Sequence, residues 1–149
     1  MKDVLIDIKG TQGIDGDTDV IEFTTMGQLA YRHGKYYLFY TENESIGAKG
    51  IKTTLKTEGD DKITMSRSGI LDSRMVIEKG QRSRCFYSTV QGQLMLGIFG
   101  EEITNTLTED GGRISMTYTI DVENNLLSRN KVEICVRKVN EDVKNSKHS

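Results

Sequence analysis

The side chains in this sequence that could form a site are tyrosines, with one acid and one base close to them in the pattern. Alternation along the predicted strands places Tyr40, Tyr87 and Tyr118 on one inner face. A buried tyrosine hydroxyl needs a hydrogen-bond partner. Glu42 has the same inward parity, and Arg74 is a cation that could neutralise it. We therefore predict that these five residues form an interior ligand-binding set, against the alternative that the tyrosines cap the ends of the fold and contact water.

Catalysis by histidine is disfavoured by the number and position of the histidines. The sequence has two, His33 in a predicted tight turn and His148 in a polar tail, and neither is placed to activate a Ser or Cys nucleophile. The adjacent acids Glu101–Glu102 and Asp60–Asp61 point to opposite faces of a strand and make no carboxylate dyad. We predict no catalytic residues, although an enzyme that uses carboxylate and tyrosine chemistry stays an alternative.

One segment resembles a metal-binding loop but lacks two of the residues that such a loop requires. Asp15, Asp17 and Asp19 alternate as the ligands of a calcium loop do. Val20 stands where that loop needs glycine, and Met26 stands where it needs a bidentate glutamate. No His/Cys set has the spacing of a zinc site. The sequence therefore predicts neither a metal nor a cofactor.

Charge and length narrow the classes of partner. The chain has 149 residues, with 20 Lys plus Arg against 22 Asp plus Glu and a net charge of −2. This length fits one domain, and a near-neutral chain has no overall attraction for nucleic acid or anionic lipid. No apolar run approaches the length of a membrane span. We predict a protein with no membrane association.

One basic segment is the exception to this neutrality. Arg74, Arg82 and Arg84 fall in neighbouring predicted strands beside Phe86 and Tyr87. Basic residues interleaved with aromatic residues can hold single-stranded nucleic acid by stacking. Arginines on an exposed barrel face also serve solubility, so nucleic acid is a disfavoured partner.

The cysteines and the first residues predict the compartment. Met1–Asp3 lead directly into strand-like residues without a secretory signal, which predicts a cytoplasmic protein with reduced thiols. Cys85 and Cys135 have opposite inward and outward parities, so we do not expect them to form a disulfide bond.

The elements that would position these side chains are strands from end to end. Apolar and polar residues alternate, no proline occurs, and glycine-marked turns separate the runs, with the strongest predicted hairpin turn at Glu109–Gly112. We predict an all-β fold: a single antiparallel, closed or nearly closed barrel of about 8–10 strands in up-and-down order. Residues 1–140 form this domain and residues 141–149 form a disordered polar tail. The predicted strands cover about residues 4–11, 19–32, 35–42, 51–57, 63–68, 75–77, 82–89, 94–107, 113–120 and 126–139.

Several segments resemble a known family, and together they cover nearly the whole chain. They are Tyr36–Glu42, Tyr87–Gly92 with Val90 in place of a proline, Gly111–Ile114, Tyr118–Asp121 and Ser128–Asn130. The chain is similar to the YwiB-like family, small bacterial proteins of unknown function with a calycin-type, lipocalin-like β-barrel. The resemblance implies a bacterial cytosolic protein and, by analogy of fold alone, an apolar small-molecule site. It supplies no catalytic residues.

Two functional hypotheses follow. The first is a non-catalytic binding protein whose mostly apolar lumen holds a small apolar ligand. The second is a structural or protein-interaction module with a filled barrel, whose outer face, including Phe39, Phe86 and Phe99, docks a partner or a second copy as a homodimer.

Overall fold

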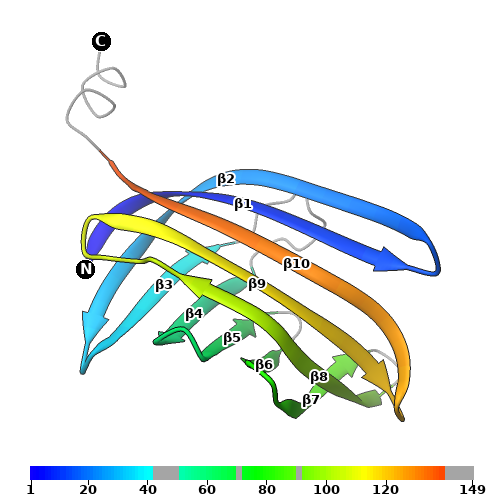
Figure 1. Cartoon of the computed structure of the whole chain (residues 1–149). Helices are drawn as coiled ribbons and strands as arrows, with labels where there is room; N and C mark the ends of the chain where they lie inside the picture. The colour runs from blue at the N-terminus through cyan, green and yellow to red at the C-terminus, as the bar shows by residue number, and fades with distance from the viewer. Residues whose placement is uncertain (42–50, 70–71, 90–91, 140–149) are drawn as a thin grey trace.

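The computed structural model describes residues 1–41, 51–69, 72–89 and 92–139, and omits the side chains of residues 87–89. The described residues form ten strands (Figure 1). None of them belongs to a helix that is long and apolar enough to span a membrane. The strands are β1 (Lys2–Ile14), β2 (Asp17–Arg32), β3 (Lys35–Thr41), β4 (Lys52–Glu58), β5 (Lys62–Ser68), β6 (Ser73–Glu78), β7 (Arg82–Thr89), β8 (Gly92–Asn105), β9 (Gly111–Val122) and β10 (Asn125–Lys138).

Each strand lies antiparallel beside its neighbour in sequence, and β10 pairs with β1 to close the barrel. This arrangement confirms the predicted all-β, up-and-down barrel. The wall is uneven, because β1, β2, β8, β9 and β10 have 12–16 residues and β3–β7 have 6–8. The β1–β2 and β9–β10 hairpins consequently reach beyond the short strands at one end (Figure 1). The predicted tail, residues 141–149, lies outside the described residues.

One junction in the wall is much weaker than the others. Among the described residues, β6 and β7 share a single registered pair, Ser73 with Tyr87. Neighbouring β5–β6 and β7–β8 have six and eight registered pairs. The turn after β6 instead hydrogen-bonds to β8, where Gly80 N donates to Gly100 O at 2.8 Å. The ring therefore closes through β8 as well as through β7.

The tight hairpins follow from residues that accept a positive φ. His33 and Gly34 have φ of 54° and 78°, and Glu123 and Asn124 have 52° and 67°. Two consecutive positive values are typical of the two-residue turn that matches strand twist. The turn at His33 was predicted from the sequence, and the turn at Glu123–Asn124 falls in the gap between the predicted strands 113–120 and 126–139.

The predicted turn at Glu109–Gly112 is placed differently. Gly111 and Gly112 lie in β9, and the turn before them closes through the bridge between Thr108 and Gly111. A Cβ on Gly111 would lie 2.4 Å from Val136 O, and one on Gly112 would lie 2.4 Å from Thr106 O. These glycines thus permit close approach of neighbouring backbones in addition to their positive φ.

Gly27 has a related role in the middle of β2. A glycine inside a strand often marks a bend or bulge, but the pairing here is unbroken on both sides, with Val4 on β1 and Tyr40 on β3. A Cβ at this position would lie 2.4 Å from both Ile6 Cδ1 and Phe39 O. Glycine is needed here because the wall and the core meet without room for a side chain.

Candidate functional site

The interior of the barrel has two halves of different character. We call the half toward the turns at 33–34 and 79–81 the closed half, and the half toward the turns at 15–16 and 123–124 the open half. Inward side chains of the closed half are fully buried aliphatic residues that pack on one another. They are Ile6, Leu38, Leu55, Ile63, Ile77, Ile98, Ile114, Met116 and Ile134. This half is a filled core and leaves no room for a ligand.

The open half has apolar inward side chains that water still reaches. By register, Ile21 on β2, Leu94 on β8 and Ile120 on β9 share the inward parity of the core residues. Ile21 is 51% exposed and Leu94 48% exposed, and Phe23, Leu96, Ile120 and Val132 are half-buried. Apolar groups gathered on a concave face and left accessible are typical of a ligand-binding surface.

Polar side chains also face the interior. Tyr40, Thr53 and Arg67 lie side by side on β3, β4 and β5. Tyr118 and Asn130 are paired neighbours on β9 and β10. Asn130 Nδ2 donates to Ser128 Oγ at 3.0 Å. We call these inward-facing residues the polar layer; they are Tyr40, Thr53, Arg67, Tyr118, Ser128 and Asn130.

Two hydroxyl groups of the polar layer, those of Thr53 and Tyr118, are buried. The Thr53 hydroxyl is fully buried and has no hydrogen-bond partner among the described residues. Buried hydroxyls are normally satisfied by protein, water or ligand. Burial raises the pKa of Tyr118 to about 12, and the positive charge of Arg67 opposes this increase. Arg67 is therefore close enough for its charge to act on the Tyr118 hydroxyl, and its Nε is itself buried.

Of the five predicted site residues, the structure places two in the interior and one on the outer face. Tyr40 and Tyr118 both face inward and are buried. Arg74 is paired with Ser66, has outward parity and is exposed, so its predicted place in the lumen is wrong. The backbone of Tyr87 pairs with Ser73 and Leu94, but its side chain is not described. Glu42 lies outside the described residues.

Arg67, not Arg74, supplies the cation of the interior. We did not predict Arg67 from the sequence, although a signal for it was present. Arg67 has the same parity as the inward residues Ile63 and Met65 on one short strand. Arg74 alternates with Met75 and Ile77 and therefore points outward. The strand pattern alone would have distinguished the two arginines.

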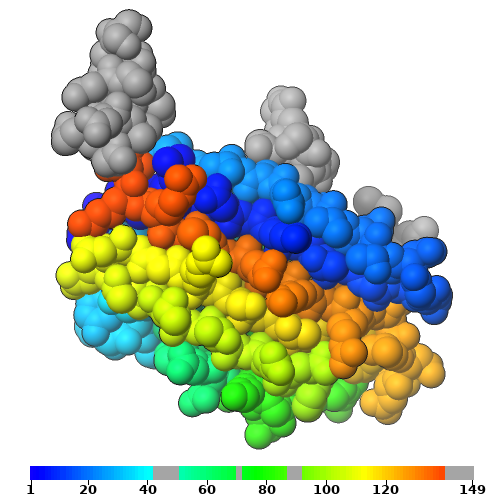
Figure 2. Space-filling model, turned by 45° about the horizontal axis from the view of Figure 1, so that its top comes forward, coloured from blue at the N-terminus to red at the C-terminus, as the bar shows by residue number. Residues whose placement is uncertain are grey.

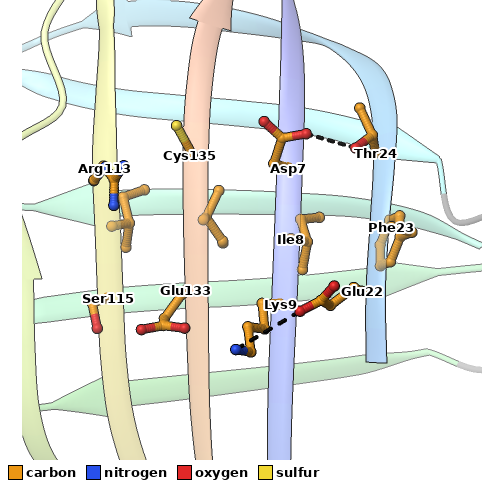
Figure 3. Close-up of a pocket in the computed structure, with 12 residues that line it drawn as sticks. Asp7, Ile8, Lys9, Glu22, Phe23, Thr24, Arg113, Ser115, Glu133 and Cys135 are labelled. Atoms are coloured by element: carbon orange, nitrogen blue, oxygen red, sulfur yellow. Dashed lines mark hydrogen bonds and ion pairs between the residues drawn. The ribbon is translucent and has the colours of Figure 1, made fainter. Parts of the chain in front are cut away.

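A separate groove of about 510 Å³ lies on the outer face, across β9, β10, β1 and β2. Figure 3 shows its polar side chains in two rows, and Figure 2 shows these four strands as adjacent bands on one side of the molecule. One row places Cys135 between Arg113 and Asp7. Asp7 accepts from Thr24 at 2.6 Å and pairs with Arg137 at 3.0 Å, while Lys9 lies 3.7 Å from Glu22.

The groove neutralises most of its own charge and offers no evident reaction centre. Cys135 lies here on the outer side and Cys85 lies in the core, so the predicted opposite parities of the two free thiols are confirmed. Within the described part of the chain, no cluster of three or more His, Cys, Asp or Glu could hold a metal ion.

The chain is similar to uncharacterised β-barrel proteins in both sequence and fold. Residues 6–134 match the family model described as a domain of unknown function, DUF1934. The chain is 30% identical over 119 residues to the uncharacterized β-barrel protein YwiB of Bacillus subtilis (strain 168), which covers 80% of this chain and 82% of that protein. The crystal structure of the ywiB protein from Bacillus subtilis superposes with a TM-score of 0.82 at 25% identity, covering 93% of each chain.

Proposed function

We propose that this chain, which belongs to the DUF1934 family of domains of unknown function, is a non-catalytic protein that binds a small, mostly apolar molecule in the open half of its barrel. The observation that carries the proposal is the exposure of inward-facing apolar side chains in the open half. Equivalent positions in the closed half are fully buried. A soluble barrel gains stability by burying such groups, so their exposure favours a ligand that covers them.

The polar layer indicates that the ligand also has a polar group. A molecule that covers Phe23, Ile120 and Val132 would end near Tyr118 and the unsatisfied hydroxyl of Thr53. Apolar sites of this kind use a few placed polar groups to fix orientation. Each methylene that the ligand removes from water contributes about 0.8 kcal/mol. The apolar body thus supplies most of the affinity, and the polar layer supplies the orientation.

Two predictions made from the sequence are compatible with a ligand-binding function. The cytoplasmic location and the calycin-type class remain predictions from the sequence and its resemblance. Both are compatible with a barrel that encloses a small ligand.

A fluorescent titration tests the proposal. The probe is cis-parinaric acid, an extended apolar chain with one polar end. We expect saturable binding, and we expect Ile120→Glu to weaken it about tenfold or more because a charge would line the apolar site. The matched control is Thr119→Glu, which introduces the same charge one residue away on the outer face of β9.

Folding of each variant is checked by circular dichroism. If Ile120→Glu fails to fold, Val132→Ser removes apolar surface from the same site with a smaller perturbation. The proposal is abandoned if the folded wild-type protein binds the probe without saturation, or if inward and outward variants bind it equally.

A further inference from the structure

The outer face of β7 and β8 carries a group of three exposed apolar side chains. Phe86, Met95 and Phe99 point outward there and are 57%, 46% and 38% exposed. Register places them in facing positions, with Phe86 opposite Met95 and Arg82 opposite Phe99. The outer groove across β9, β10, β1 and β2 presents paired charges instead (Figure 3). We propose that this β7–β8 face docks a second copy of the chain.

One glycine of this face lies beneath a charged side chain. Gly97 pairs with Arg84 on one side and Asp121 on the other. The guanidinium of Arg82 crosses it to reach Asp121, with Nη2–Oδ1 at 2.6 Å and Nε–Oδ2 at 3.0 Å. A Cβ on Gly97 would lie 2.3 Å from Arg82 Nη2. This bidentate pair fixes the Arg82 guanidinium over Gly97, where a larger residue would displace it.

Beside Gly97 lies a hollow lined by two charges that have no partner among the described residues. The hollow has a volume of about 510 Å³ and lies between β7, β8 and the turn after β9. Arg84 lines one side, and Glu123 lines the other side. Both are exposed, and neither has a hydrogen bond or ion pair among the described residues. One face thus offers an unpaired cation, an unpaired anion and a recess between them.

These features are complementary to themselves under a two-fold rotation. An axis parallel to the strands, between β7 and β8, exchanges the two strands when two copies pack face to face. Phe86 then covers Met95 of the second copy, which is a favourable sulfur–aromatic contact, and Phe99 of the second copy packs on the aliphatic stem of Arg82. Arg84 enters the hollow of the second copy beside its Glu123. Each contact occurs twice, as an isologous interface requires.

The charge of the face favours a second copy over nucleic acid. Arg82 and Arg84 are balanced by Asp121 and Glu123, and Arg82 is already bound by Asp121. A surface that binds single strands needs uncompensated cations along the phosphate path. Two of the three arginines of the basic segment noted in the sequence, Arg82 and Arg84, are thus matched by carboxylates on this face, which suits a second copy better than a polyanion. Arg74 lies on the neighbouring strand β6.

Sedimentation equilibrium of the full chain, up to about 1 mM protein, tests the dimer. We expect a monomer–dimer equilibrium that Phe86→Ser weakens about tenfold or more, because exposed aromatic residues dominate such contacts. The matched control is Val20→Ser, which removes a 54% exposed apolar side chain from β2. It should leave the association constant unchanged.

A charge-exchange cycle tests the proposed packing itself. Arg84→Glu and Glu123→Arg should each weaken association, and the double variant should restore it because the paired charges are only exchanged. A monomer at all concentrations, equal loss in the Val20→Ser control, or no restoration in the double variant overturns the proposal. Binding of single-stranded oligothymidylate that depends on Arg84, without self-association, also overturns it and assigns the face to nucleic acid.

Discussion

The closed and open halves of the interior share the long strands and yet differ in how far water reaches their apolar side chains. β2 runs through both: it supplies Leu29 to the filled core and Ile21 to the exposed surface of the open half. The closed half contains aliphatic side chains packed without access to water, which stabilises the barrel. In the open half, long hairpins carry apolar groups past the ends of the short strands. Under the proposed function, stability would thus depend mainly on the closed half of each long strand, and binding on the open half.

Truncation of a core residue should give the largest contrast between the halves. We expect Leu38→Ala in the closed half to reduce the free energy of unfolding by about 2–5 kcal/mol, because it leaves a cavity in a filled core. Ile21→Ala in the open half should reduce it by less than about 1 kcal/mol. Urea denaturation of both variants measures the difference. Equal losses would mean that the open half is part of the core.

A pair of glycine substitutions sharpens the comparison with a single methyl group. Gly27→Ala should destabilise the barrel by about 1–3 kcal/mol, because the new Cβ meets the Phe39 carbonyl as well as Ile6. Gly10→Ala in the open half adds the same atom with nothing within 4 Å. Thermal unfolding should separate the two variants, and a stable Gly27→Ala protein would show that the wall yields there.

Tyr118 belongs to the polar layer and should give an alkaline signature. Its pKa is raised to about 12 by burial, so the folded state holds this proton more tightly than the unfolded state. Stability contributed by neutral Tyr118 is complete below about pH 10 and falls, by on the order of 2 kcal/mol, as pH rises toward 12. Tyr118→Phe should remove this part of the alkaline loss in urea midpoints. An unchanged alkaline profile in the variant would contradict the burial of the hydroxyl.

The smallest effect belongs to the outer wall of the open half. A hydrogen bond from Arg82 lowers the pKa of Asp121, so their interaction stabilises the folded state above the usual aspartate range and is lost at acid pH. Asp121→Asn should reduce the free energy of unfolding by about 0.5–1 kcal/mol at neutral pH, since the arginine is partly exposed. The difference from wild type should shrink as pH falls below about 4. A constant difference at all pH values would assign the effect to something other than charge.

Most of the fold could be predicted from the sequence, because strand alternation and turn residues are local signals. Ten strands, their up-and-down order and the inward positions of Tyr40 and Tyr118 could all be predicted from parity. Exposure could not, because Leu38 and Ile21 have the same parity. Their different burial depends on where β2 passes the ends of the short strands, which only the pairing shows.

The polar layer was predicted in part for the same reason. Arg67 could have been assigned to the interior from its own strand, whereas its proximity to Tyr118 depends on how β5 and β9 face each other across the barrel. The pairing of Arg82 with Asp121 joins two strands that are 39 residues apart in sequence. No local pattern predicts such a contact.

The single registered pair between β6 and β7 has a mechanical consequence. Local unfolding begins where the fewest interactions hold the structure together. We therefore expect the barrel to open between β6 and β7 before any other pair of strands separates. On loosening, the molecule would become a ten-stranded ribbon with β6 and β7 as its free borders, and unpaired borders invite strands from other chains. Backbone amides on these two strands should accordingly be among the first in the barrel to exchange with deuterated solvent.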